Sequence, residues 1–190
     1  MPEQDLDLEL LAVAGTTALE AQAYLDAVTE VATGRMNDTA ISVLLLAVSQ
    51  VLLAGARLGA MGDVVLVERF EPDAGPDPDV DPVRAGLANV LHGIDEFADV
   101  ADPLTDARLV PGTLSDDLAS VAADLVHGLR HHEAGRVEEA LWWWQFSYLS
   151  SWGPRATATL RTLQSLLGHL RLDVDPEVVA GAEFDALHAR

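Results

Sequence analysis

The sequence contains no cysteine and no lysine, and each absence narrows what the chain can do. Without cysteine there is no disulfide, no cysteine-ligated zinc, no iron–sulfur cluster and no thiol catalysis. All 11 basic residues are arginine, against 31 Asp and Glu, which leaves a formal net charge of −20. A surface this negative repels phosphate groups, so we expect no direct nucleic-acid binding and no docking on anionic membranes.

Aromatic residues are also scarce, at 5% of 190 residues, yet hydrophobic residues reach 49%. That content predicts a single domain with a substantial core. The first nine residues are acidic and lack the regions of a signal peptide, so we expect a cytoplasmic protein. The stretch 39–56 carries no charge, but Ser49 and Gln50 lie near its middle, which favours a buried core helix over a membrane span.

Helical periodicity dominates the chain, which predicts an all-α fold. The expected helices cover about 11–32, 38–58, 81–100, 115–135, 137–152 and 154–170. Between the second and third lies a long acidic loop rich in proline and glycine, at 60–81, and a shorter loop is expected at 101–113. Residues 174–190 are predicted to form a tail with at most a short helix. The prediction is one compact bundle of about six helices, with its core at 10–173.

The fifth predicted helix carries aromatic residues on nearly every side. Trp144 and Tyr148 share one face, whereas Trp143 and Phe146 point elsewhere. A helix of this kind should be surrounded by protein and form the interior pillar of the bundle. The alternative is a stacking platform for a planar ligand. Gln145 lies on the same side as Tyr148, so it needs a hydrogen-bond partner if it is buried.

The second predicted helix places Gln50 and Arg57 on one side, among apolar neighbours. A guanidinium in such surroundings needs a carboxylate or an anionic ligand, because an unpaired buried charge is costly. An ion pair with the acidic loop, for example with Glu68, is the first interpretation. A ligand pocket and a surface arginine with its stem on apolar neighbours are the others. The candidate ligand-binding residues are Gln50, Arg57, Glu68, Gln145, Trp144 and Tyr148.

Metal and catalytic motifs are weak. Asp124, His127 and His131 have the spacing of ligands on one helix face, but both imidazoles are expected near solvent, and His132 is expected in the core. The acidic run at 77–81 resembles the start of a calcium loop but is interrupted by proline and lacks the turn glycine and closing Glu. We therefore predict no metal, no cofactor and no catalytic residue.

Three segments carry a resemblance to a known family. They are 44–59 (LLLAVSQVLLAGARLG), 68–79 (ERFEPDAGPDPD) and 139–154 (EALWWWQFSYLSSWGP). Together they resemble an actinobacterial family of uncharacterised proteins, the domain of unknown function numbered 5063, over about 10–173. The absence of lysine fits a GC-rich genome of that type. The resemblance implies a cytoplasmic bacterial protein and transfers no catalytic residues.

For function, the leading prediction is a non-enzymatic interaction or adaptor module whose acidic surface recognises a basic protein partner. The alternative is a small-ligand-binding bundle with a pocket near Gln50, Arg57 and Gln145. A metal-dependent enzyme around Asp124, His127 and His131 is a third hypothesis. An apolar face on the first or sixth predicted helix could also support a homodimer.

Overall fold

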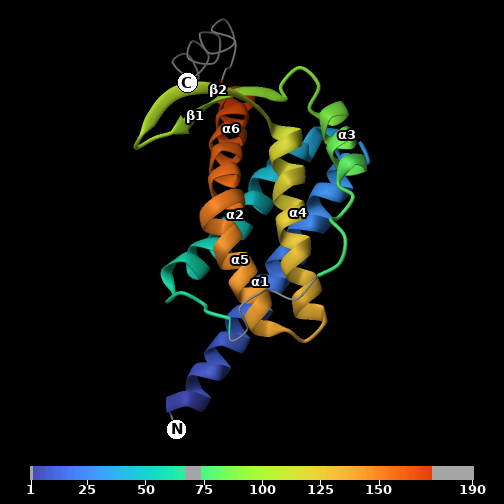
Figure 1. The fold of residues 1–190 in the computed structure, drawn as a ribbon. Helices are drawn as coiled ribbons and strands as arrows, with labels where there is room; N and C mark the ends of the chain where they lie inside the picture. The colour runs from blue at the N-terminus through green and yellow to red at the C-terminus, as the bar shows by residue number, and fades with distance from the viewer. Residues whose placement is uncertain (1, 67–73, 173–190) are drawn as a thin grey trace, which may run out of the picture.

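The computed structural model describes residues 2–66 and 74–172 of the chain (Figure 1). Within them, η1 is a 3₁₀ turn and η2 a π-helical segment. The elements in chain order are α1 (Pro2–Ala32), η1 (Asn37–Thr39), α2 (Ala40–Ala60), α3 (Asp81–Val90), β1 (Glu96–Asp102), β2 (Asp106–Thr113), α4 (Leu114–Glu133), α5 (Val137–Ser147), η2 (Tyr148–Trp152) and α6 (Gly153–Leu172).

The helices form a bundle in which α1 packs against α2, α3 and α4. Helix α2 also packs against α6, and α4 packs against α5 and α6. Figure 1 shows the two strands lying across one end of α6, with α3 and the start of α4 at that same end. The mostly helical prediction is confirmed. Residues 61–66 and 74–80, the described parts of the predicted loop at 60–81, contain neither helix nor strand.

Helix α2 is the one helix in the described part of the chain that is long and apolar enough, by length and composition alone, to cross a membrane. Its inner face is buried in the bundle, with Leu44, Val48, Val51 and Leu58 at most 1% exposed. One face is buried against α1 and α6, whereas Leu46 and Leu53 on the other face are 60% and 55% exposed, so α2 is half-buried and not the fully buried core helix that was predicted.

Close helix contacts are possible because glycine stands where large rings approach. A Cβ built on Gly128 would lie 2.1 Å from Nε1 of Trp144. A Cβ on Gly55 would lie 2.4 Å from the rings of Trp152 and Tyr148. Both tryptophans are fully buried. The rings of α5 and η2 therefore fit directly against the backbones of α4 and α2, and we call these contacts the interlocked seam.

The all-α prediction is wrong for residues 96–113, which form an antiparallel hairpin with Glu96 opposite Thr113 and Ala98 opposite Pro111. The third helix was expected to reach residue 100 but ends at Val90. The physical reason is Gly93, whose φ of 86° is a left-handed conformation that follows a helix end.

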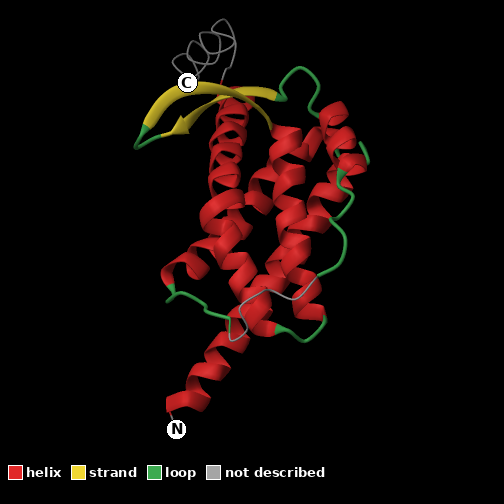
Figure 2. Ribbon diagram, in the orientation of Figure 1, coloured by secondary structure: helices red, strands yellow, loops and turns green. Residues whose placement is uncertain are grey.

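The predicted break between a fifth and a sixth helix is also wrong. Helices α5 and α6 are joined without interruption through η2 and form one continuous helical segment (Figure 2). The described residues therefore contain five separate helical segments where about six were expected. Proline has no N–H and its ring crowds the preceding turn. Here the chain before Pro154 accommodates the proline by widening into the π-helical segment Tyr148–Trp152 instead of stopping.

Candidate functional site

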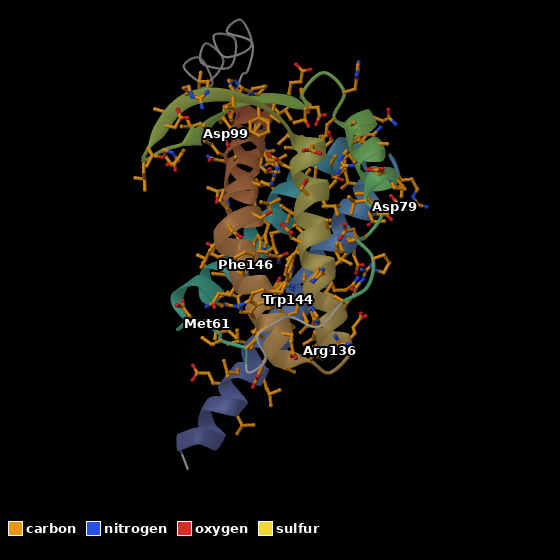
Figure 3. All side chains as sticks on the ribbon, in the orientation of Figure 1. Met61, Asp79, Asp99, Arg136, Trp144 and Phe146 are labelled. Carbon is orange, nitrogen blue, oxygen red and sulfur yellow. The ribbon has the colours of Figure 1, made fainter. Side chains whose placement is uncertain are left out.

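Helix α5 is buried on one face only, which revises the picture of a pillar enclosed on all sides. Trp144 is fully buried, and its Nε1 donates to the Leu125 carbonyl oxygen at 3.2 Å. By contrast, Phe146 is 52% exposed and stacks on Trp142 at the surface. Both Trp144 and Phe146 are labelled in Figure 3.

Gln145 is buried, and its amide group is engaged by the backbone after α2. Its Nε2 donates to the carbonyl oxygens of Leu58 at 2.9 Å and Gly62 at 3.2 Å. Its Oε1 accepts the backbone N–H of Val64 at 2.8 Å. The expected partner of this side chain is thus main chain. Gln145 anchors the segment that leaves α2, and a ligand would have to displace these bonds to reach it.

The other candidate ligand-binding residues are spread over different surroundings. Gln50 and Arg57 lie on the exposed side of α2. Arg57 borders a small cavity of about 170 Å³ beside Glu9. Its guanidinium group makes no hydrogen bond or ion pair with any described residue. Glu68 lies outside the described residues, so the predicted ion pair stays a prediction. Tyr148 packs against α2 and also reaches a groove at the other side of η2.

The burial of the histidines of α4 differs from what was expected from the sequence. His131 is fully buried, whereas it was expected near solvent. His127 is half-buried with its ring centroid 3.9 Å from that of Trp143. His132, expected in the core, is half-buried near Trp144. Across the part of the chain that the structure covers, no three His, Asp or Glu residues gather in a way that could hold a metal ion.

A short polar row joins α4 to η2 and α6. The Ser151 hydroxyl donates to Oδ2 of Asp124 at 2.7 Å, and Arg155 pairs with Asp117 at 3.3 Å. Burial raises the pKa of the Asp124 carboxyl, and the Ser151 hydrogen bond opposes the rise. Burial likewise raises the pKa of Asp117, against the charge of Arg155. These groups have partners inside the fold, so their arrangement is explained by packing of α4 on α6.

A groove of about 530 Å³ lies between the hairpin and the long helix beneath it. Its walls come from β1 and the following turn on one side, and from η2 and α6 on the other. Arg161 of α6 donates to Oδ1 of Asp99 at 2.7 Å and so ties β1 to α6 at the groove. Leu149 on the opposite wall is 60% exposed. The groove is therefore mostly apolar on both walls, and its charged residues are the paired Asp99 and Arg161.

A second hollow, of about 750 Å³, is formed on the hairpin itself. Phe97, Leu109 and Pro111 supply apolar surface, while Glu96 and Asp116 supply carboxylates. Leu109 is 71% exposed. Apolar residues flanked by carboxylates suit a segment that is itself basic and partly apolar.

The hairpin belongs to an acidic end of the molecule, which we call the acidic cap and define as residues 81–117. The acidic cap carries eight Asp and Glu against two Arg, a net charge of −6, whereas residues 118–172 carry four against five, a net charge of +1. Figure 3 shows Asp99 in the upper part of the view and Arg136 at the opposite end of the bundle. Residues 2–66 carry nine Asp and Glu against two Arg, a net charge of −7, so the acidic cap is one of two acidic regions in the described chain.

Charged side chains within the acidic cap mostly have partners. Arg84 bridges Asp81 and Asp116, and Arg108 pairs with Asp106. Glu96 differs, because its side chain is exposed and its carboxylate makes no hydrogen bond or ion pair with any described residue. Its carboxylate is the one in the hairpin best placed to meet a positive charge on a partner.

The family model described as Domain of unknown function (DUF5063) matches residues 10–169. The chain belongs to this family. The matched residues contain every described element except the ends of α1 and α6, and they include the whole acidic cap. The family suggested by the three sequence segments is therefore confirmed.

A solved structure, protein BF1032 from Bacteroides fragilis, is similar to this chain with a TM-score of 0.65 at 16% sequence identity. The alignment covers 85% of this chain and 93% of that one. At this identity the likeness shows that the two share a fold. The search of curated proteins found no match. No activity comes to this DUF5063 member from its relatives, so its function has to be argued from its own surface.

The sequence analysis missed the groove and the hairpin that borders it. It treated residues 91–113 as a helix end and a loop. The signal that could have shown the early end of the third helix is Gly93, because glycine suits the position after a helix end. The residues that follow it have no helical apolar stripe. Of the predicted candidates, only Tyr148 borders this groove.

Proposed function

We propose that this DUF5063 member is an acidic interaction module that binds a basic, partly apolar segment of a protein partner through the acidic cap. The observation that carries the proposal is the hairpin end of the molecule, where residues 81–117 carry a net charge of −6 beside two partly apolar hollows. A negative end steers basic partners toward itself, and apolar hollows beside the carboxylates provide area to bury.

The binding test uses a defined basic peptide and a pair of charge-reversal variants. Glu96→Lys reverses an exposed, unengaged charge in the acidic cap, and Glu133→Lys makes the same change in the last turn of α4, outside the cap. We expect Glu96→Lys to weaken binding about threefold to tenfold and Glu133→Lys to have less than about a twofold effect. Equal effects of the two substitutions would show that net charge alone attracts the peptide, and would contradict the proposal.

Salt provides the second measurement. Raising ionic strength from about 0.05 to 0.5 M shortens the screening length severalfold, so the affinity of the wild-type protein should fall by roughly tenfold or more. An affinity that does not change with salt would count against charge recognition.

The small-ligand alternative near Gln50, Arg57 and Gln145 stays a prediction. The side-chain amide of Gln145 is hydrogen-bonded to three backbone groups. Gln50 and Arg57 lie on the exposed face of α2. The acidic cap offers larger hollows than the cavity of about 170 Å³ beside Arg57. For that reason we favour the interaction module.

A further inference from the structure

We infer that the partner segment binds as an added β-strand on the outer edge of β1, as an extended chain that alternates basic and aliphatic residues. This inference rests on the proposed function and specifies the mode of binding at the same acidic cap. It follows from the hydrogen-bond pattern of the hairpin, the chemistry of its two edges and the charge along β1.

The hydrogen-bond pattern shows which backbone groups face outward. In an antiparallel pair, residues alternate between pairs that exchange backbone hydrogen bonds and pairs whose N–H and C=O groups point away from the partner strand. The Leu114 N–H donates to the Asp95 carbonyl at 2.9 Å, so that pair is of the first kind. In this register, Glu96, Ala98 and Val100 belong to the second kind.

The outer edge of β1 is therefore an open row of donors and acceptors. Within residues 2–66 and 74–172, β1 pairs with β2 alone, in a two-stranded sheet. Glu96 and Ala98 are exposed, and Val100 is half-buried beside the groove. A strand edge of this kind is a template for an incoming extended chain.

The outer edge of β2 is less suitable. Pro111 lies opposite Ala98, in a pair whose groups face outward, and proline has no N–H to donate. The row of donors on β2 is therefore interrupted at its middle. β1 contains no proline, and its row is regular from Glu96 to Val100, before the irregularity between Val100 and Asp102. The chain thus protects one edge of the hairpin and leaves the other available.

Charge along β1 selects the occupant. Glu96, Asp99 and Asp102 all lie on this strand; Asp99 is paired with Arg161, whereas Glu96 has no such partner among the described residues. A second copy of the chain pairing through β1 would add its own carboxylates along the same edge, and like charges across a strand pair are destabilising. A basic strand would gain where a second copy would lose. The exposed Leu149 on the far wall of the groove suits aliphatic residues at alternate positions.

The decisive experiment measures binding of a short peptide that alternates arginine and valine. Its control is the same peptide with every second backbone nitrogen methylated, so that one edge can no longer donate. We expect the unmodified peptide to bind wild-type protein at least about tenfold more tightly than the methylated peptide.

Two proline variants locate the edge. Ala98→Pro removes an outward N–H from β1 without removing a ladder bond, and should weaken binding about fivefold to tenfold. Leu109→Pro makes the same change on the outer edge of β2. Because Leu109 also lines the hairpin hollow, its reference is Leu109→Ala, and these two variants should bind within about twofold of each other. Continued exchange protection of the Val110 amide, which lies in a hydrogen-bonded pair, shows that the hairpin is intact in both variants. The methylated peptide tests the idea even if a variant loses the hairpin.

Amide exchange gives an independent readout on the unmodified protein. The amides of Glu96, Ala98 and Val100 should exchange rapidly in the free protein and become protected when the peptide binds. Protection of these amides in the free protein at a concentration where it sediments as a dimer would identify a second copy as the occupant and overturn the inference.

The outcomes separate this inference from the proposed function. If the methylated peptide binds equally well and Glu96→Lys still weakens it, strand addition is overturned and charge recognition stands. If neither Glu96→Lys nor salt affects the peptide, the proposed function is overturned together with the inference. If Leu109→Pro weakens binding and Ala98→Pro does not, the partner pairs with β2 and the assignment to β1 is wrong.

Discussion

The interlocked seam and the acidic cap are held together in different ways. At the seam, glycines of α2 and α4 lie directly against the rings of Tyr148, Trp144 and Trp152, with no space for another atom. In the acidic cap, ion pairs and a helix cap connect exposed elements, as when Asp95 accepts from the backbone N–H and the hydroxyl of Ser115. The seam depends on shape and the cap on charge, so we expect substitutions in the cap to disturb the core less than substitutions in the seam.

The sharpest way to test this contrast is the same substitution in both regions. Gly128→Ala would place a Cβ 2.1 Å from Nε1 of Trp144, a ring that is itself fully buried. Despite a gain in helix propensity, we expect a loss of about 3 kcal/mol in the free energy of unfolding. Gly112→Ala in the hairpin meets the tip of the half-buried Phe97 ring at 2.9 Å, and should cost less than about 1 kcal/mol.

Urea denaturation of the two variants measures both values. A Gly128→Ala variant as stable as Gly112→Ala would show that the tryptophan can move aside, and the description of a rigid seam would fail.

The next largest effect concerns Gln145, where the end of α2 is attached to α5. Gln145→Ala removes three hydrogen bonds to backbone groups and leaves a space, so we expect a loss of about 2 to 3 kcal/mol. Gln164→Ala, on the exposed side of α6, is the matched control and should change stability by less than about 0.5 kcal/mol. Denaturant midpoints decide between them. An unchanged midpoint in Gln145→Ala would reopen a ligand-binding role for this residue.

The smallest effect separates the two regions by the sign of their pH dependence. Burial raises the pKa of Asp124 above its ordinary value of 3.8, so the folded protein binds this proton more tightly than the unfolded chain does. This carboxyl therefore lowers stability as pH rises from about 4 toward neutral. Asp124→Asn should remove that trend and raise stability at neutral pH by about 0.5 kcal/mol at most, because solvent screens the half-buried group.

Asp102, the last residue of β1, has the opposite effect on the pH dependence of stability. The backbone N–H of Leu104, with help from Thr105, lowers the pKa of Asp102 below 3.8. Its contribution to stability is present at neutral pH and is lost as pH falls below about 4. Asp102→Asn should thus lower the denaturation midpoint at neutral pH and leave it unchanged in strong acid. A midpoint that moves in the same direction for Asp124→Asn and Asp102→Asn would contradict the assignment.

Much of the helical architecture was predictable from the sequence. The boundaries of α4 were anticipated closely, and Gly34 and Gly135 both have the positive φ expected just after a helix. Periodic apolar residues identify the inner faces because burial depends on which side of a helix a residue occupies. The need of Gln145 for a partner was also foreseen, though the partner proved to be backbone.

The hairpin and the groove were not predictable in the same way. β1 and β2 show no clear alternation of apolar and polar residues, since both lie largely on the surface and one carries three carboxylates. The burial of His131 was missed because helical position alone does not say which neighbouring helix covers that side. Strand pairing and helix contacts join residues that are distant in the chain, and local patterns carry little information about them.

The sequence by itself determined the class of this molecule, namely a mostly helical, strongly acidic domain without thiol chemistry, because composition and periodicity act locally. Only the tertiary structure decided that the acidic segment 81–117 lies beside two hollows, that β1 keeps an open edge above a groove, and that Trp144 lies against Gly128. Those features depend on which distant segments meet, and packing of the whole chain selects those meetings.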